Sequence, residues 1–222
     1  MLIKAGAFGG AFARRALLGL MLAVLVGPAL AETAPTSREH LERLARSKPA
    51  DQKAAQDAGK KAAFFCANCH GDSGLSKYGE VPNLAGQHPL YILSQIDAFL
   101  AGKRKDAFMQ GLMKVLSAED KATIAVFYAA QQVAPSVATP GAQAAAGREL
   151  FQKNCARCHG ADAKGGESFP RLAGQQAEYL RRNIRRYLDM SGERTYPPMT
   201  AAVTGLGEKN IEAVVDYLSS LK

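Results

Sequence analysis

The sequence predicts an all-α protein built from two similar helical domains in tandem. Apolar residues recur at the i, i+3, i+4 spacing of amphipathic helices, and the alternation typical of strands is absent. Several short motifs also occur twice, always 88 to 90 residues apart. A repeat of that length, with its own helices in each copy, indicates a duplicated domain rather than a solenoid.

The chain begins with a pattern typical of a secretory signal peptide. Basic residues precede an apolar stretch over residues 16–26, and Ala29-Leu30-Ala31 supplies the small residues of a cleavage site. A retained membrane anchor is the alternative, but the stretch is much shorter than the roughly 20 apolar residues that span a bilayer. We therefore expect residues 1–31 to be removed after export to the periplasm.

The charge of the chain argues against a nucleic-acid partner. The formal net charge is +8, and three of the positive charges lie in the predicted signal peptide. The remaining excess is small and spread over both halves, without the basic patch that nucleic-acid binding requires. After residue 31, no segment is apolar enough to suggest a membrane span, so we expect a soluble mature chain.

All four cysteines lie in two copies of the pattern Cys-x-x-Cys-His. The first copy is Cys66-Ala67-Asn68-Cys69-His70, and the second is Cys155-Ala156-Arg157-Cys158-His159. Two thiols on one helical turn can add to the two vinyl groups of a haem, and the histidine that follows can present its imidazole to the iron from the same side.

Other uses of paired cysteines fit this pattern less well. An exported protein with four cysteines ordinarily suggests disulfides, and a single Cys-x-x-Cys also suits a thioredoxin-like redox pair or a zinc site. None of these explains a histidine directly after the second cysteine in both copies. We therefore predict two covalently bound haem c groups, attached through Cys66, Cys69, Cys155 and Cys158, with His70 and His159 as iron ligands.

The repeat continues on both sides of the cysteines. Residues 82–87, Pro-Asn-Leu-Ala-Gly-Gln, match residues 170–175, Pro-Arg-Leu-Ala-Gly-Gln. The two halves of the chain are therefore expected to share one domain structure.

The expected domain organisation has four parts after the signal peptide. We expect a charged N-terminal extension over residues 32–50 with a helix from Ser37 to Leu44, a first domain over 51–132, a Pro- and Gly-containing linker over 133–146, and a second domain over 147–222. The expected helices span about 52–65, 91–99 and 124–128 in the first half, and 144–153, 179–188 and 211–218 in the second; Ser117 and Asp120 form a capping box.

Each haem iron needs a sixth ligand, and a methionine sulfur favours the reduced iron. Met109 lies 39 residues after His70, and Met199 lies 40 residues after His159. Each methionine also precedes a repeated leucine by seven positions, and this shared register makes Met109 and Met199 the predicted ligands. Most methionines are core residues, and Met113 and Met190 are the rival candidates.

The proline that opens each repeated loop has a predicted role beside the haem. Pro82 and Pro170 follow their histidines by twelve and eleven residues, so their carbonyl groups could accept a hydrogen bond from the second imidazole nitrogen. The simpler alternative is a turn proline without such a contact. We expect His40 and His88 to be a solvated residue and a loop residue, respectively, rather than ligands.

Two basic segments are candidates for docking a partner. The run Arg181-Arg182-Asn183-Ile184-Arg185-Arg186 could face an acidic protein, although cations on a solvated helix face are the common explanation. The same alternatives apply to Lys103-Arg104-Lys105.

The motifs together resemble the dihaem cytochromes c4. The resemblance covers about residues 50–221 and depends on the two haem motifs, the Pro-x-Leu-Ala-Gly-Gln loops, the methionine before Leu-Ser-x-x-Asp, and the Tyr-Ala-Ala-Gln end of the first domain. It implies two class I cytochrome c domains related by a pseudo-twofold axis, His/Met ligation at both irons, and haem propionates that face the domain interface. Residues 32–50 depart from the family pattern.

The resemblance implies a periplasmic electron carrier, soluble or peripherally associated with the membrane. Its redox protein partners would be a quinol-oxidising complex and a terminal oxidase or reductase. One alternative is the electron-acceptor subunit of a periplasmic dehydrogenase, such as a flavocytochrome. A dihaem peroxidase is a third class, but it needs one iron without a methionine, and both halves offer one.

Overall fold

The computed structural model describes residues 34–133 and 141–221, which are helical and contain no strand. The predicted signal peptide over residues 1–31 lies outside the described residues, and so does the middle of the predicted linker, residues 134–140. Among the residues that are described, no helix combines the length and the apolar character needed to cross a membrane.

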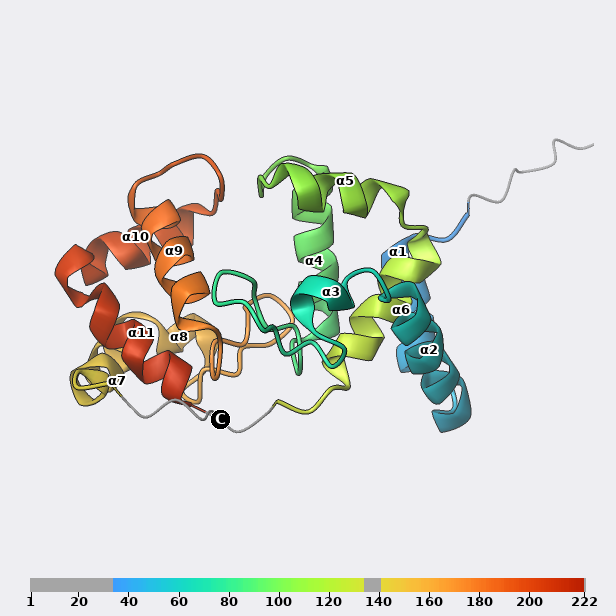
Figure 1. Cartoon of the computed structure of the whole chain (residues 1–222), viewed down its shortest axis with the longest axis horizontal. Coiled ribbons are helices and arrows are strands. Elements are labelled where there is room, and N and C mark those ends of the chain that lie inside the picture. Colours follow the sequence, from blue (N-terminus) through green and yellow to red (C-terminus); the bar gives the residue numbers. More distant parts are fainter. Residues whose placement is uncertain (1–33, 134–140, 222) are drawn as a thin grey trace, which may run out of the picture. The chain divides into compact units, whose positions relative to one another are not determined.

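The two halves repeat one arrangement of helices, with an extra helix at the start of the first half (Figure 1). The helices of the first half are α1 (Ser37–Ala45), α2 (Pro49–Ala62), α3 (Ala67–His70), α4 (Pro89–Leu100), α5 (Ala107–Val115) and α6 (Ala118–Ala129). Those of the second half are α7 (Ala144–Asn154), α8 (Ala156–His159), α9 (Ala177–Leu188), α10 (Pro197–Leu206), the 3₁₀ turn η1 (Glu208–Asn210) and α11 (Ile211–Ser220).

The observed ends of α4, α7, α9 and α11 lie within two residues of the expected ones, whereas α6 begins at Ala118, six residues before the expected run 124–128 and directly after the predicted capping residue Ser117. The α2 helix differs as well. This helix begins at Pro49, where proline is favoured because the first helical position needs no N–H. It ends at Ala62, three residues before the expected end at Phe65. The predicted capping box of α6 is confirmed, since Ser117 accepts from the Asp120 N–H and the Asp120 carboxylate accepts from Ser117.

A glycine allows close packing of two helices in each half. The α2 helix lies against α6, and α7 lies against α11 (Figure 1). A Cβ atom on Gly59 would collide with the backbone of Thr123, and one on Gly147 would collide with the backbone of Ala213. The repeat therefore preserves glycine at the crossing point because a larger residue would separate the two helices.

Each half has its own hydrophobic core. The first core includes Phe127 and Tyr128 of α6, whose rings lie 4.9 Å apart, and the second includes Phe151, whose ring lies 5.6 Å from that of Tyr217. Two separate cores are what a duplicated domain predicts.

The N-terminal helix α1 belongs to the first core. Leu41 is buried, and the helix packs against α4 and α6. Thr36 and Glu39 form a capping box at its start. The predicted charged helix is thus confirmed, and its apolar side covers the first half while its charged side faces solvent.

The two Leu-Ala-Gly-Gln loops are joined by reciprocal hydrogen bonds. Gln175 accepts from the Asn83 N–H at 2.7 Å and donates to the Asn83 carbonyl at 3.0 Å. In the same manner, Gln87 accepts from the Arg171 N–H at 2.8 Å and donates to the Arg171 carbonyl at 3.3 Å. Each Leu-Ala-Gly-Gln motif therefore supplies the glutamine that pairs with the loop of the other half.

Candidate functional site

The two cysteines of each motif lie on one helical turn and point into a shared cavity. Cys66 precedes α3, and its carbonyl accepts from the N–H groups of Cys69 and His70 at 3.2 and 2.9 Å. In the second half, the Cys155 carbonyl accepts from Cys158 and His159 at 3.1 Å each. All four sulfurs are free of disulfide bonds, as thioether attachment requires.

The cavity has a volume of about 860 Å³ and is lined from both halves. Its walls are largely apolar and include Leu84, Ile92, Phe99, Leu172, Leu180 and Val203. The same cavity contains every residue that the sequence analysis assigned to the haems, namely Cys66, Cys69, His70, Met109, Cys155, Cys158, His159 and Met199.

Each haem-motif histidine is oriented by the proline carbonyl that the sequence analysis singled out. His70 Nδ1 lies 2.9 Å from the Pro82 carbonyl oxygen, and His159 Nδ1 lies 3.1 Å from that of Pro170. A carbonyl only accepts, so Nδ1 carries the proton and Nε2 keeps its lone pair for a metal. The predicted carbonyl contact is confirmed in both halves.

Burial keeps these imidazoles neutral. Both rings are nearly buried, with exposed fractions of 7% for His70 and 6% for His159. Burial lowers the pKa of each histidine, and the hydrogen bond to the proline carbonyl only partly opposes this effect. A neutral imidazole is the form that binds a metal.

The cysteines lack the properties of reactive thiolates. Burial raises the pKa of the Cys66 thiol, and burial together with Cys158 raises that of Cys155 to about 11. A thioredoxin-like cysteine has a lowered pKa instead. Among the described residues, no cluster of three or more His, Cys, Asp or Glu side chains could hold a zinc ion.

The rival methionines differ in their positions. Met109 at the start of α5 and Met199 at the start of α10 are half-buried and line the cavity. Met113 also borders the cavity but is a core residue, 5% exposed. Met190 is 74% exposed and lies outside the cavity. In the first half, Met113 therefore stays an alternative to Met109 as the iron ligand. In the second half, the position of Met190 argues against it as an alternative to Met199.

Two arginines, missed as site residues in the sequence, meet in the cavity. Arg104 comes from the first half and Arg194 from the second, and both guanidinium groups donate to the Tyr179 hydroxyl, at 3.0 and 3.1 Å. They also share the Gln95 side-chain oxygen, at 3.1 and 2.9 Å. A sequence signal was present, since each arginine precedes the predicted methionine ligand by five positions.

Neither of these arginines has an acidic partner among the described residues. Burial raises the pKa of Tyr179, but the two positive charges outweigh burial and bring it down to about 8. Cations that favour ionisation of a neighbouring phenol occupy a site that attracts negative charge. The arginines thus bring two positive charges together at the wall of the cavity.

The cavity residues fit a haem. Haem c supplies two vinyl groups for the cysteines, an iron for the imidazoles and two carboxylates for cationic groups. The Tyr128 hydroxyl and the Arg171 Nε are buried without a hydrogen-bond partner among the described residues, and both residues line the cavity. Unpartnered polar atoms in an otherwise apolar cavity are expected where a polar prosthetic group binds.

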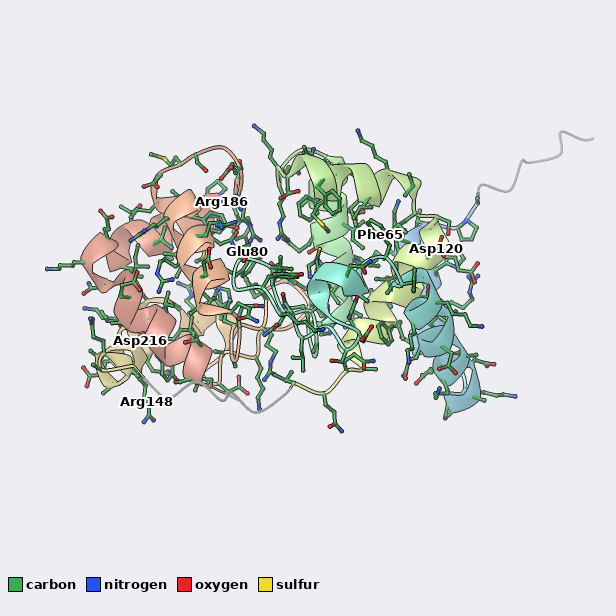
Figure 2. The ribbon with its side chains drawn as sticks, viewed as in Figure 1. Phe65, Glu80, Asp120, Arg148, Arg186 and Asp216 are labelled. Carbon is green, nitrogen blue, oxygen red and sulfur yellow. The ribbon has the colours of Figure 1, made fainter. Side chains whose placement is uncertain are left out.

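Of the remaining candidates, His40 and His88 lie outside the cavity lining, whereas part of the basic run of α9 borders it. His88 caps α4 by accepting from the Leu90 N–H, and His40 contacts Arg43 on the exposed side of α1. Arg186 lies on α9 (Figure 2), and the four arginines of that run pair with Glu178, Glu193 and Glu212. A mixed-charge helix face, the simpler explanation for this run, therefore fits the structure better than docking of an acidic partner.

Comparisons with known proteins agree with this site. The chain matches the cytochrome c family over residues 56–131 and again over 144–222. It is 33% identical to cytochrome c4 of Pseudomonas aeruginosa over 178 residues, which are 74% of this chain and 87% of that protein. It is 32% identical to the thiosulfate dehydrogenase electron acceptor of Thiomonas intermedia, over 71% and 79% of the two chains.

A solved structure is similar as well. The crystal structure of reduced cytochrome c4 from Pseudomonas stutzeri superposes with a TM-score of 0.67 at 30% identity, over 75% of this chain and 98% of the other.

Proposed function

We propose that this chain, which belongs to the cytochrome c family and within it to the dihaem cytochromes c4, carries electrons in the periplasm between a quinol-oxidising respiratory complex and a terminal oxidase or reductase. It is an electron-transfer cytochrome with two covalently bound haem c groups. The observation that carries the proposal is the cavity that gathers, from each half, two cysteines, a carbonyl-oriented histidine and a methionine.

We propose specific roles for the residues of each half. Cys66 and Cys69, and likewise Cys155 and Cys158, form the thioether bonds. His70 and His159 are the fifth ligands, while Met109 and Met199 are the sixth. Haem iron supplies a reversible one-electron change between its ferric and ferrous forms.

The surrounding residues favour electron transfer over catalysis. Pro82 and Pro170 fix the imidazole planes, so the ligand set needs little rearrangement when the charge changes. Met109 and Met199, if they hold the two irons, would keep peroxide and other small ligands away, which argues against the peroxidase alternative. Arg104 and Arg194 would serve as counterions for haem carboxylates and offset the charge of the added electron.

The organisation of the precursor is part of the proposal. Residues 1–31 would direct export, residues 51–132 and 147–222 would form the two cytochrome c domains, and residues 133–146 would link them. The mature chain would be soluble or peripherally associated with the membrane.

The test is reconstitution with purified respiratory complexes. Protein isolated from the periplasm should be reduced by a quinol-oxidising complex and its quinol, then reoxidised by a terminal oxidase, with both haems turning over. The change at the haem absorption bands should correspond to two electrons per chain. Reduction by dithionite without any exchange with either complex would contradict the proposed partners while leaving the carrier function intact.

A second candidate is the electron-acceptor subunit of a periplasmic dehydrogenase. It is favoured by the similarity to a protein described as a thiosulfate dehydrogenase electron acceptor. Affinity purification should separate the two functions: stable co-purification with a dehydrogenase, either a flavoprotein or a thiosulfate-oxidising enzyme, together with reduction by its substrate, would favour this candidate over the respiratory carrier.

A further inference from the structure

Four exposed apolar side chains lie on the two segments beside the first haem site, the one before α3 and α5. We call Phe64, Phe65, Phe108 and Val115 the phenylalanine patch; their exposed fractions are 79%, 54%, 58% and 79%. The ring of Phe65 (labelled in Figure 2) lies 6.3 Å from that of Phe108, so the segment before α3 contacts α5. Phe108 and Val115 are seven positions apart and so share one face of α5. Exposed apolar patches of this kind mark interaction sites.

The phenylalanine patch borders the first redox site. Phe65 directly precedes Cys66, and Phe108 directly precedes Met109 and lines the cavity. The other three patch residues lie outside the cavity lining. Because electron-transfer rates fall steeply with distance, a protein seated on this patch would be well placed to exchange electrons with the first haem.

The second half lacks an equivalent patch. The residues that precede Cys155 by the same distances are Lys153 and Asn154, and those at the positions of Phe108 and Val115 are Pro198 and Gly205. The large apolar side chains exposed among the described residues of the second half are Met190 and Tyr196, which belong to the segment before α10. Duplication therefore kept the haem site in both halves, but the apolar patch is present only in the first.

Free positive charges border the patch. Lys60 and Lys61 lie in the last turn of α2, and Lys114 lies next to Val115 on α5. All three are exposed, and none forms an ion pair within the described part of the chain. The four arginines of α9, by contrast, all form ion pairs, with three glutamates between them. The segments that carry the patch thus also carry three such lysines, and apolar residues accompanied by charged ones are usual in a transient interface.

We propose that the phenylalanine patch, with Lys60, Lys61 and Lys114, is the docking surface for an acidic electron-transfer protein whose contact face has an apolar centre. Electrons then exchange with this partner through the first haem, and the second haem exchanges with the first. The proposal rests on the proposed carrier function. The lysines attract the acidic partner from a distance, and the apolar side chains stabilise the complex once it has formed.

The test uses flavodoxin hydroquinone, an acidic protein that exposes an edge of its flavin, as the electron donor. Stopped-flow absorbance would follow reduction of the ferric haems in the wild type, in Lys60→Glu/Lys61→Glu and in Phe64→Ser/Val115→Ser. We expect the charge reversal to slow the second-order reaction about tenfold at low ionic strength, with the difference shrinking as salt is added. The serine variant should weaken the complex measured by calorimetry without abolishing this salt dependence.

The matched control reverses charge at the corresponding place in the second half. Arg148 follows Gly147 as Lys60 follows Gly59, and Lys153 precedes Cys155 as Phe64 precedes Cys66. The variant Arg148→Glu/Lys153→Glu should change the rate less than twofold. An equal or larger effect of this control, or no effect of either patch variant, would overturn the proposal.

Further measurements distinguish other occupants and a failure of the carrier function. If sedimentation showed wild-type dimers that Phe64→Ser/Val115→Ser dissociates, the patch would be a self-association surface. If the same variant alone released the protein from anionic phosphatidylserine vesicles, the patch would be a membrane contact. Either result would replace the proposed partner. Each variant should still be reduced fully by dithionite, and a wild type that dithionite reduces but no protein donor does would count against the carrier function instead.

Discussion

The backbones of Arg104 and Arg194 pair in an isolated antiparallel bridge, although the two residues come from different halves of the chain. Each guanidinium also lies over an aromatic ring of its own half, Arg104 over Phe99 at 4.4 Å and Arg194 over Tyr187 at 5.5 Å. Two like charges held together without an acidic partner are unfavourable unless an anion offsets them. The two arginines occupy matching positions in the repeat, so each half contributes one positive charge to the same part of the cavity.

Replacing Arg194 by Gln should lower the haem reduction potentials. A nearby positive charge stabilises the added electron, so its loss should shift the reduction free energy by an amount on the order of 1 kcal/mol per electron. A spectroelectrochemical titration that follows both haems would measure this shift. Arg182→Gln is the control, because Arg182 lies on the same half but is exposed and paired with Glu178. Potentials that respond equally to the two variants would rule out a special role for Arg194.

The reciprocal glutamines should couple unfolding of the two halves. In the double variant Gln87→Ala/Gln175→Ala, four hydrogen bonds between the loops are lost. Since each bond contributes about 0.5–1.5 kcal/mol, we expect a single cooperative denaturation transition to broaden or separate into two. Circular dichroism and haem absorbance followed together would detect it. Gln110→Ala, which removes a bond within the first half, is the control.

Alanine variants of Met109, Met199 and Met113 should distinguish methionines that bind the haem iron from a methionine that only packs in the core. Met109→Ala and Met199→Ala should each remove half of the weak sulfur-to-iron absorption of the ferric protein. Met113→Ala should preserve that absorption but lower the free energy of unfolding by about 2–5 kcal/mol, because Met113 is buried in the first core. Loss of the absorption in Met113→Ala, with its retention in Met109→Ala, would reverse the ligand assignment in the first half.

Gly147, where α7 packs against α11, should not tolerate a larger residue. Gly147→Ala places a Cβ against the backbone of Ala213, so we expect α7 to move away from α11 and the free energy of unfolding to fall by at least about 1–3 kcal/mol. Gly111→Ala is the control, because Gly111 lies within α5 with open space around it. This control should stabilise the protein by up to about 1 kcal/mol through helix propensity. Chemical denaturation of both variants would measure the contrast.

The sequence predicted local features well because those features depend on nearby residues. The haem motifs, the helix over 37–44, the Ser117 capping box and the carbonyls of Pro82 and Pro170 all depend on short spacings, and the structure contains each of them. The end of α2 was placed three residues too late, because Phe64 and Phe65 continue the apolar pattern beyond the helix. Apolar periodicity does not distinguish a buried residue from an exposed patch residue.

Features that join the two halves could not be derived from spacing. The repeated Leu-Ala-Gly-Gln motif was visible, but sequence alone does not show that Gln87 and Gln175 cross to the opposite loop. The basic segments were treated alike, yet Arg104 turns into the cavity while the arginines of α9 pair with glutamates. Such outcomes depend on which side chains the tertiary fold brings together.

The Arg181–Glu212 pair should make stability depend on pH in the acid range. Arg181 holds the Glu212 carboxylate with bonds of 2.7 Å from both Nε and Nη2, and this hydrogen bonding lowers the pKa of Glu212 below its ordinary 4.5. A lowered carboxyl pKa stabilises the fold above the unfolded-state value, and this stabilisation is lost as pH falls through the lower folded-state value. Because the two side chains are 34% and 43% exposed, we expect Glu212→Gln to cost only about 0.5 kcal/mol near pH 7. Denaturation midpoints of the wild type and the variant should therefore converge below about pH 4. A difference that stays constant down to that pH would show that the pair acts through packing between α9 and α11 and not through the charge of Glu212.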